Sequence, residues 1–258
     1  MNHTKLLVFV AIIIFGFSSC SNPSRRPLEV LDHERLINVT ACRSFSIDYF
    51  RMLANVKFQY SQVPVAKYPE LKNNPAYLYY STLDADKLYA KYKQNLKSKT
   101  KRDETYSFAY KLSDYPAWKG YEHKRNFYNN VNTNEIVNSF KKVDQKANKK
   151  KIAYAKKILE LELSFSVADE VLKRMTDKIP KYETKTFMKI NFSSMMKVSR
   201  EISLPYYFLV IKSMKDKDIE KIIKIYEGPE FKLYKKVLID TIITDMEEYK
   251  KKEQRNEV

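Results

Sequence analysis

The sequence predicts a mainly α-helical protein, and three observations carry this prediction. Glycine occurs only 3 times in 258 residues, although average usage is about 7%, and tight β-hairpin turns depend on residues that accept positive φ. Apolar residues recur at three- and four-residue steps along most of the chain, which is the period of a helix with one buried face. The C-terminal half reads as consecutive helices separated by breaks. We therefore expect a C-terminal antiparallel helical bundle and a mostly helical N-terminal region with room for one small β element.

Composition excludes several classes of functional site. Gly16, Gly120 and Gly228 stand far apart, so neither a dinucleotide-binding glycine fingerprint nor a phosphate-binding P-loop is present. With 3 His and 2 Cys, the chain has too few ligands for a zinc site of several His and Cys residues. We therefore expect no cofactor and no metal. The 48 Lys and Arg outnumber the 31 Asp and Glu, which gives a formal net charge of +17.

Residues 1–19 have the features of an export signal. A polar start with one cation, Lys5, precedes the apolar run Leu6–Phe17, and two small residues, Ser18 and Ser19, follow it. The apolar run is shorter than the roughly 20 residues that span a membrane. We expect the signal to be removed and the mature protein to reside in the cell envelope, or to be periplasmic or secreted, with residues 20–27 as a linker.

Cys20 has two interpretations. The segment Phe17-Ser18-Ser19-Cys20 resembles the lipobox of bacterial lipoproteins, and this resemblance implies lipid attachment at Cys20 and contact with a membrane surface through that lipid. Cys42 would then be a buried thiol without a partner. Ordinary signal cleavage nearby would instead leave Cys20 able to pair with Cys42 in an oxidising compartment. The sequence leaves both readings open.

The region 28–131 is predicted to be mixed. A helical stripe runs from Leu28 to about Val56, and several prolines then interrupt regular structure before Ser81 or Thr82 caps the next helix. The buried face of that helix is predicted at Leu88, Tyr92 and Leu96. A strand is predicted to follow, because Tyr106, Phe108, Tyr110 and Leu112 alternate with small or polar residues. Tyr115-Pro116 and Lys119-Gly120 are expected to end the strand.

Residues 132–151 are predicted to form a basic helix and linker. Asn132 and Glu135 have the spacing of a capping box. The lysine-rich stretch Lys141–Lys151 reads as a solvated helix face or linker, with a docking patch for phosphate or lipid headgroups as the alternative.

Residues 152–250 are predicted to form the helical bundle domain, followed by a polar tail at 251–258. The helix that begins near Ile152 is expected to continue until Ile179-Pro180, because two apolar rows follow it. Later helices are expected around Phe187–Val198, over Tyr206–Met214, from Asp216 or Asp218 to Gly228-Pro229, and from Phe231 to about Tyr249.

One segment of this bundle carries a family resemblance. The run from Asp218 to Pro229, with an acidic start, an aliphatic stripe, Tyr226, Gly228 and Pro229, resembles the recurrent stretch of a bacterial family catalogued as domain of unknown function twenty fifty-nine. The resemblance covers about Ile152–Lys236. It implies an exported α-helical domain and assigns no catalytic residues.

No catalytic group emerges from the remaining residues. Nucleophilic triads need a histidine base, and only His33 and His123 remain after the leader is removed. His33 reads as a solvated side chain in the first turn of a helix, and His123 as a solvated side chain in a charged loop, Glu122–Arg125. The carboxylate pairs Glu160/Glu162 and Asp240/Asp245 have no motif context.

The sequence therefore favours a structural or interaction module with a protein partner in the envelope, rather than an enzyme. A secreted hydrolase with a carboxylate-based site, or a polyanion-binding protein, is the alternative. The 20 Tyr and 14 Phe interleaved with lysine are compatible with stacking on single-stranded nucleic acid. The excess of Lys over Arg and the export signal argue against that partner, so no nucleic acid is expected.

Overall fold

The computed structural model describes residues 27–43, 75–162 and 203–255, together with residues 49–50, 53–54, 57–58, 167 and 170–171. Every regular element within these residues is a helix, so the mainly α-helical prediction is confirmed. In chain order the labelled helices are η1 (Leu28–Val30, a 3₁₀ helix), α2 (His33–Arg43), α4 (Pro75–Thr82), α5 (Ala85–Lys99), α6 (Arg102–Ser113), α7 (Pro116–Asn129), α8 (Thr133–Lys141), α9 (Lys149–Leu161), α12 (Asp216–Glu227) and α13 (Pro229–Gln254). Residues 203–211 are also helical. The export signal, Cys20 and the helix predicted around Phe187–Val198 lie outside the described residues.

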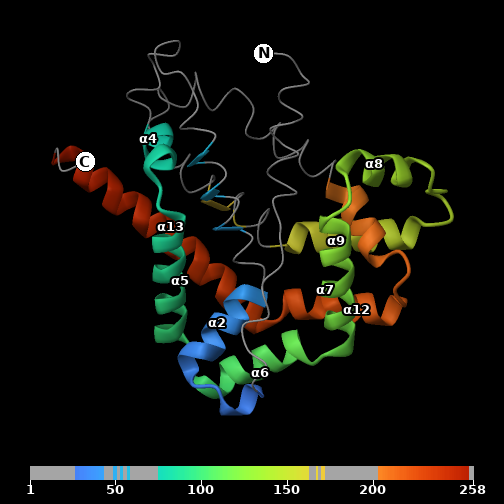
Figure 1. Ribbon diagram of the computed structural model, residues 1–258, viewed down its shortest axis with the longest axis horizontal. Helices are drawn as coiled ribbons and strands as arrows, with labels where there is room; N and C mark the ends of the chain where they lie inside the picture. Colours follow the sequence, from blue (N-terminus) through green and yellow to red (C-terminus); the bar gives the residue numbers. More distant parts are fainter. Residues whose placement is uncertain are drawn as a thin grey trace, which may run out of the picture.

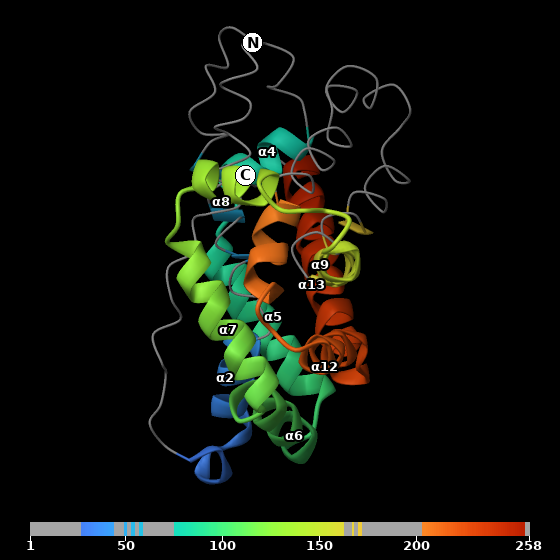
Figure 2. The ribbon, with the colours of Figure 1, turned by 90° about the vertical axis from the view of Figure 1, so that its right-hand side faces the viewer.

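The helices pack around a shared apolar core. Helix α2 packs on α5 and α6, α13 lies against α5, and α12 contacts α7, α9 and α13. Figure 1 shows α13 running diagonally past α5, and Figure 2 shows α7 and α12 from the side. One cluster of buried apolar side chains extends from Ile37 to Ile242. The predicted regions 28–131 and 152–250 therefore contribute to the same core.

Aromatic side chains fill much of this core. Trp118, Tyr121 and Tyr234 are fully buried, and the rings of Phe108 and Tyr234 meet edge to face at 4.8 Å between centroids. The Tyr234 hydroxyl lies 2.5 Å from Oγ1 of Thr40, which gives a buried phenol the hydrogen-bond partner it needs. The high tyrosine content thus serves packing at these positions.

The start of α2 departs from the continuous stripe expected from Leu28. The 3₁₀ helix η1 ends at Val30, and α2 begins at His33 after two residues that belong to neither helix. The carboxylate of Asp32 accepts a hydrogen bond from the backbone N–H of Arg35 at 2.8 Å. This side chain satisfies a free N–H of the first turn, which favours a new helix start at this point.

Helix α5 confirms its predicted buried face. Leu88, Tyr92 and Leu96 are all buried. The N-cap is Asp84, whose side chain accepts from the backbone N–H of Lys87 at 2.9 Å. The predicted caps, Ser81 and Thr82, instead lie at the end of α4.

The predicted strand over residues 106–112 is wrong, because these residues belong to α6. The Glu104 carboxylate accepts from the backbone N–H of Lys101 at 3.0 Å and fixes the helix start. The buried residues Thr105, Phe108 and Leu112 recur at helical steps, whereas Tyr110 is 52% exposed. The alternation of apolar residues over 106–112 therefore does not report a strand, because the buried residues follow one face of a helix that includes Thr105.

Helix α7 also corrects an expectation. Pro116 occupies its first turn, where a missing N–H costs little. The Lys119-Gly120 pair lies inside this helix and does not end an element. A Cβ atom at Gly120 would meet nothing within 4 Å, so packing does not require glycine there.

Helices α8 and α9 flank the lysine-rich stretch. The predicted cap Asn132 is confirmed, since its side chain accepts from the backbone N–H of Asn134 at 2.8 Å. Helix α9 ends at Leu161 instead of continuing to Pro180, and Glu162 takes an extended conformation as its C-cap. Residues 167 and 170–171 are helical again, and the rest of the predicted helix up to Pro180 lies outside the described residues.

The last two helices meet at Gly228. Ile219, Ile222, Ile223 and Tyr226 are buried along α12, as predicted, but its N-cap is Lys215 rather than an aspartate. Gly228 has φ −66, so positive φ does not explain it. A Cβ there would lie 3.1 Å from the Ile225 carbonyl oxygen, so close approach of the backbone favours glycine. Helix α13 then begins at Pro229.

Candidate functional site

The histidine expected in a solvated first turn is engaged in contacts between helices. His33 is half-buried at the start of α2. Its Nε2 lies 3.1 Å from Oγ1 of Thr100 and 3.2 Å from Oγ1 of Thr105. Both threonine hydroxyls can donate to backbone carbonyls, those of Leu96 and Lys101. Through these two contacts the His33 ring joins α2 to Thr100, at the α5–α6 connection, and to Thr105 on α6.

His123 lies elsewhere and is exposed. It belongs to α7, so its predicted placement in a charged loop is wrong. The structure does not bring His33 and His123 into one set of contacts within the described residues.

The two carboxylates of each pair considered in the sequence lie in different surroundings. Glu160 is exposed on α9, whereas Glu162 is 2% exposed. Asp240 accepts from Nζ of Lys236 at 2.6 Å, whereas Asp245 accepts from the Tyr79 hydroxyl at 3.1 Å. Each carboxylate of these pairs thus has its own environment, unlike the two acids that flank one bond in a glycosidase.

Cys42 bears on the two readings of Cys20. It lies in the last turn of α2, is only half-buried, and is disulfide-bonded. A free thiol at Cys42 was expected only if Cys20 carries a lipid, so the disulfide favours the other reading, in which the two cysteines pair. The sequence contains one other cysteine, Cys20.

The most unusual group of side chains is a buried polar centre, formed by Tyr121, Arg125, Glu162, Tyr206 and Tyr226. Arg125 and Glu162 are 4% and 2% exposed, and Nη1 of Arg125 lies 3.9 Å from Oε1 of Glu162. The guanidinium also lies over the Tyr121 ring, 5.8 Å from its centroid. The hydroxyls of Tyr121 and Tyr226 are 3.4 Å apart.

Four segments of the chain bring this centre together. Helix α7 supplies Tyr121 and Arg125, the end of α9 supplies Glu162, residues 203–211 supply Tyr206, and α12 supplies Tyr226. The break after Leu161 places Glu162 outside the regular helix. Tyr206 further donates to Oδ1 of Asn129 at 2.6 Å. The centre therefore ties four helical segments together at one point.

Burial and neighbouring groups shift the pKa values of two tyrosines and of Arg125 in the buried polar centre. Burial raises the pKa of the Tyr121 and Tyr226 phenols above their usual value, because a phenolate would be poorly solvated there. Burial opposes the charge on Arg125, but the surrounding tyrosines, Tyr206 foremost, hold its pKa well above the usual value. Neutral phenols and a fixed cation suit hydrogen bonding and packing rather than proton transfer near neutral pH.

A second, less buried ion pair joins the end of α2 to α7. Nη1 of Arg43 lies 3.3 Å from Oε2 of Glu122, and their side chains are 23% and 21% exposed. Burial raises the pKa of the Glu122 carboxyl to about 7, even though Arg43 acts to lower it. The charge of Glu122 therefore changes near neutral pH.

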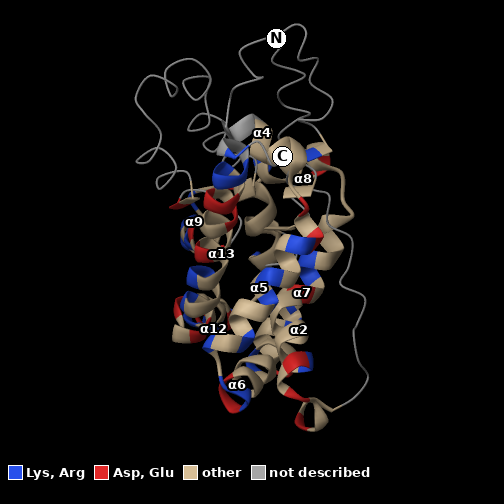
Figure 3. Ribbon diagram, turned by 90° about the vertical axis from the view of Figure 1, so that its left-hand side faces the viewer, with Lys and Arg blue, Asp and Glu red and all other residues tan. Residues whose placement is uncertain are grey.

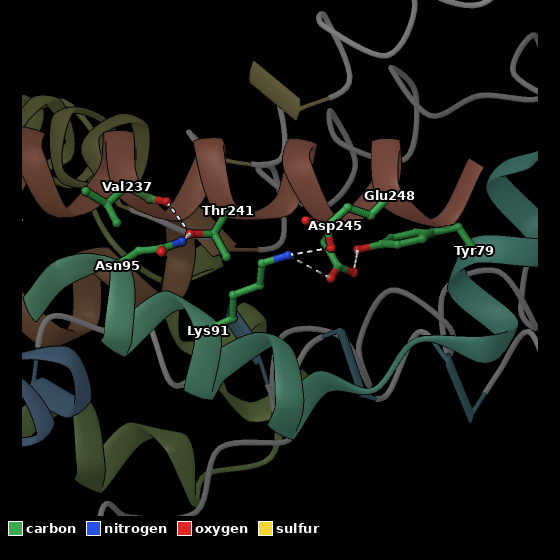
Figure 4. A network of polar contacts seen from close by, with 7 residues as sticks. All are labelled: Tyr79, Lys91, Asn95, Val237, Thr241, Asp245 and Glu248. Carbon is green, nitrogen blue, oxygen red and sulfur yellow. Dashed lines mark hydrogen bonds and ion pairs between the residues drawn. The ribbon is translucent and has the colours of Figure 1, made fainter. Parts of the chain in front are cut away.

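A third group, the α5–α13 network, lies between α5 and α13, with Tyr79 added from α4 (Figure 4). The Tyr79 hydroxyl donates to Oδ2 of Asp245 at 3.1 Å. Nζ of Lys91 lies 3.6 Å from Oδ1 of Asp245 and 2.8 Å from Oε2 of Glu248. The Lys91 and Asp245 side chains are each 30% exposed.

One further bond extends this network along the helix pair. Nδ2 of Asn95 donates to Oγ1 of Thr241 at 2.9 Å, and Thr241 itself donates to the Val237 carbonyl at 2.7 Å. Together these contacts fix how α5 lies against α13.

The sequence-based reasoning missed the buried polar centre. Arg125 was expected in a charged loop, yet it follows Trp118 and Tyr121 on one face of α7 at seven- and four-residue steps. That spacing was a usable signal, because an arginine within an aromatic helical face has to be buried or to bend away. Its partner Glu162 carried no local signal.

Comparison of the chain with known proteins finds no relative. No family model, curated protein or solved structure matches the chain. The resemblance of residues 218–229 to an exported family thus stays a prediction. Within the described residues, no group of His, Cys, Asp and Glu has the arrangement of a metal site. In that same part of the chain, no helix combines the length and apolar character needed to cross a membrane.

Proposed function

We propose that the chain is exported and that its helical body acts as a structural or interaction module in the cell envelope. The observation that carries this proposal is the leader, in which a cationic start, the apolar run Leu6–Phe17 and two serines precede Cys20. The disulfide at Cys42 supports it independently, because disulfides persist mainly in oxidising compartments outside the cytosol.

The side chains of the body support a module rather than an enzyme. His33 bridges two threonines between helices, and the buried polar centre joins four segments of the chain. These arrangements favour a stiff scaffold.

Two fates of the Cys20 sulfur are proposed, and they exclude each other. The lipobox-like segment ending at Cys20 favours lipidation, and a lipid chain together with a cationic body would add two weak membrane signals. The disulfide at Cys42 favours the second fate, in which Cys20 is its partner and the protein is secreted without a lipid. A sulfur that carries a lipid cannot also form a disulfide.

Metabolic labelling distinguishes these fates. Wild type, Cys20→Ala and Cys42→Ala would be expressed with the full leader in a bacterial host and labelled with a palmitate analogue. The intact masses of the membrane and soluble fractions would be measured without reducing agent. Lipidation predicts label in wild type and Cys42→Ala, none in Cys20→Ala, and a mature chain that begins at Cys20.

The alternative outcomes are equally distinct. A soluble, unlabelled wild type whose mass falls by two hydrogens relative to its reduced form supports the disulfide, and both variants then lose that difference. A chain that keeps Met1 and stays in the cytosol overturns export itself.

A further inference from the structure

The lysine-rich turn between α8 and α9 does not stand alone in the folded chain. Residues 141–151 contain six lysines and one aspartate. Residues 212–218, which comprise the connection before α12 and the first residues of α12, contain three lysines and two aspartates. These two segments, each with its adjoining helix ends, are called the two turns below. Lys150 and Lys151 lie 2.8 Å and 2.9 Å from the Asp216 carboxylate, so they hold the two turns side by side.

This arrangement leaves most of the other lysines to solvent. We define the lysine surface as the exposed members of the two turns: Lys141, Lys142, Lys146, Lys149, Lys212, Lys215 and Lys217. None of the seven forms an ion pair within the part of the chain that the structure describes.

The acidic groups nearby do not offset this charge. Asp216 is already shared by two lysines, whose hydrogen bonds lower its pKa. The Asp144 carboxylate accepts from the backbone N–H groups of Lys146 and Ala147 and so shapes the α8–α9 turn. Asp218 is the remaining acid in the two turns, so the surface is strongly positive.

A second basic stretch of the chain, Lys97–Arg102, has cations that are paired within the protein. In Lys97–Arg102, Nζ of Lys97 lies 2.8 Å from the Glu34 carboxylate. Arg102 donates to the carbonyls of Leu31 and Glu29 and lies 3.7 Å from the Asp103 carboxylate. Figure 3 shows positive and negative residues side by side at the start of α6. Lys97 and Arg102 are thus engaged by the chain itself, whereas Lys99 and Lys101 are exposed and form no ion pair among the described residues. The lysine surface differs in the number of such lysines that two neighbouring segments bring together.

We propose that the lysine surface binds a linear polymer with closely spaced phosphate groups. Lysine ammonium groups bind phosphate oxygens as point charges, and cations spread over two neighbouring turns match a chain of anions better than one small anion. The large exposed apolar side chains of the described residues, Val30, Phe58, Tyr110 and Phe127, all lie outside the two turns. A bilayer-binding surface normally adds such side chains for insertion, so the polymer is the better match.

The test compares two triple variants of equal charge change. The surface variant is Lys142→Gln/Lys146→Gln/Lys149→Gln. The matched control is Lys99→Gln/Lys101→Gln/Lys232→Gln, three exposed lysines outside the two turns. The probe is long-chain inorganic polyphosphate, and its Kd would be measured between about 50 and 200 mM salt, with circular dichroism to verify folding.

The proposal predicts a clear separation of the two variants. The surface variant should weaken binding about tenfold and reduce the slope of log affinity against log salt by about 2, because each lost phosphate contact contributes about 0.7. The control should change Kd less than about twofold. Equal losses in both variants, or no binding by the wild type, overturn the proposal.

A vesicle experiment excludes the competing occupant. Vesicles of phosphatidylcholine with phosphatidylglycerol replace the polymer in the same comparison. Selective loss of vesicle binding in the surface variant, with polymer binding unchanged, would assign the surface to a bilayer and overturn the proposal. This inference names a partner for the proposed interaction module, but its test uses purified chain. If polymer binding fails, the export proposal is therefore unaffected. If export fails, the polymer-binding proposal is likewise unaffected.

Discussion

Arg125 with Glu162 and Lys91 with Asp245 are ion pairs of similar separation, 3.9 Å and 3.6 Å, in different surroundings. The first has side chains 5% and 3% exposed, and the second has both side chains 30% exposed. Each pair joins helices that are distant in the sequence, and each is accompanied by a buried tyrosine hydroxyl.

The difference shows how burial, rather than pairing, sets the energetic role of a charge. In the buried polar centre, water cannot compensate for a missing partner, so loss of one charge leaves the other poorly solvated. In the α5–α13 network, water can replace either partner at modest cost. The Arg43–Glu122 pair lies between these cases, with side chains about one-fifth exposed.

The largest expected effect is at Arg125. Arg125→Ala leaves Glu162 buried without this cation, and we expect the free energy of unfolding to fall by about 3–5 kcal/mol. Urea unfolding at pH 7 measures this change. The control Arg35→Ala removes an exposed pair with Asp32, whose side chains are 56% and 64% exposed, and should cost less than about 0.5 kcal/mol.

A double variant sharpens the same comparison. Arg125→Met/Glu162→Leu replaces both charges by apolar side chains, and we expect it to be more stable than Arg125→Ala. If Arg125→Ala instead costs no more than the Arg35 control, the buried polar centre does not have the energetic role assigned to it.

The intermediate pair predicts a pH dependence. The Glu122 carboxyl has a pKa of about 7 in the folded chain against an ordinary value of 4.5. Between these values the folded chain holds a proton that the unfolded chain has released. The stabilisation is therefore complete below about 4.5 and is lost as pH rises to about 7, by at most about 1.4 kcal/mol per pH unit.

Glu122→Gln should remove this dependence because the amide stays neutral. At pH 8 we expect the variant to be more stable than wild type by about 1–3 kcal/mol, whereas at pH 4 the difference should be small. Urea unfolding across this range checks both values. Glu160→Gln, which changes an exposed carboxylate on α9, should keep the wild-type profile, and parallel profiles of wild type and Glu122→Gln would contradict the assignment.

The spacing of apolar residues along each segment explains which helices could be predicted from the sequence. Leu88, Tyr92 and Leu96 are large apolar residues at four-residue steps, so the buried face of α5 follows from them alone. In α6, Phe108 and Leu112 fit both a strand and a helix. The residues that distinguish the two, Thr105 and Ala109, are buried but too small or polar to signal burial.

The buried polar centre was out of reach for a different reason. Burial of Arg125 depends on Glu162 and Tyr206, which lie 37 and 81 positions further along the chain. No local pattern reports such a contact. The same limit applies to the lysine surface, because the ion pairs to Asp216 that join its two turns connect residues 65 or more positions apart.

The smallest expected effects lie in the α5–α13 network. Asp245→Ala deprives the Tyr79 hydroxyl of its acceptor, and Tyr79 is only 3% exposed, so we expect a loss of about 1–2 kcal/mol. Lys91→Ala removes only the half-exposed cation and should cost less than about 1 kcal/mol. Asp245→Asn keeps an acceptor oxygen for Tyr79 and should resemble Lys91→Ala in urea unfolding. A loss in Lys91→Ala as large as that in Arg125→Ala would mean that exposure does not separate these two ion pairs.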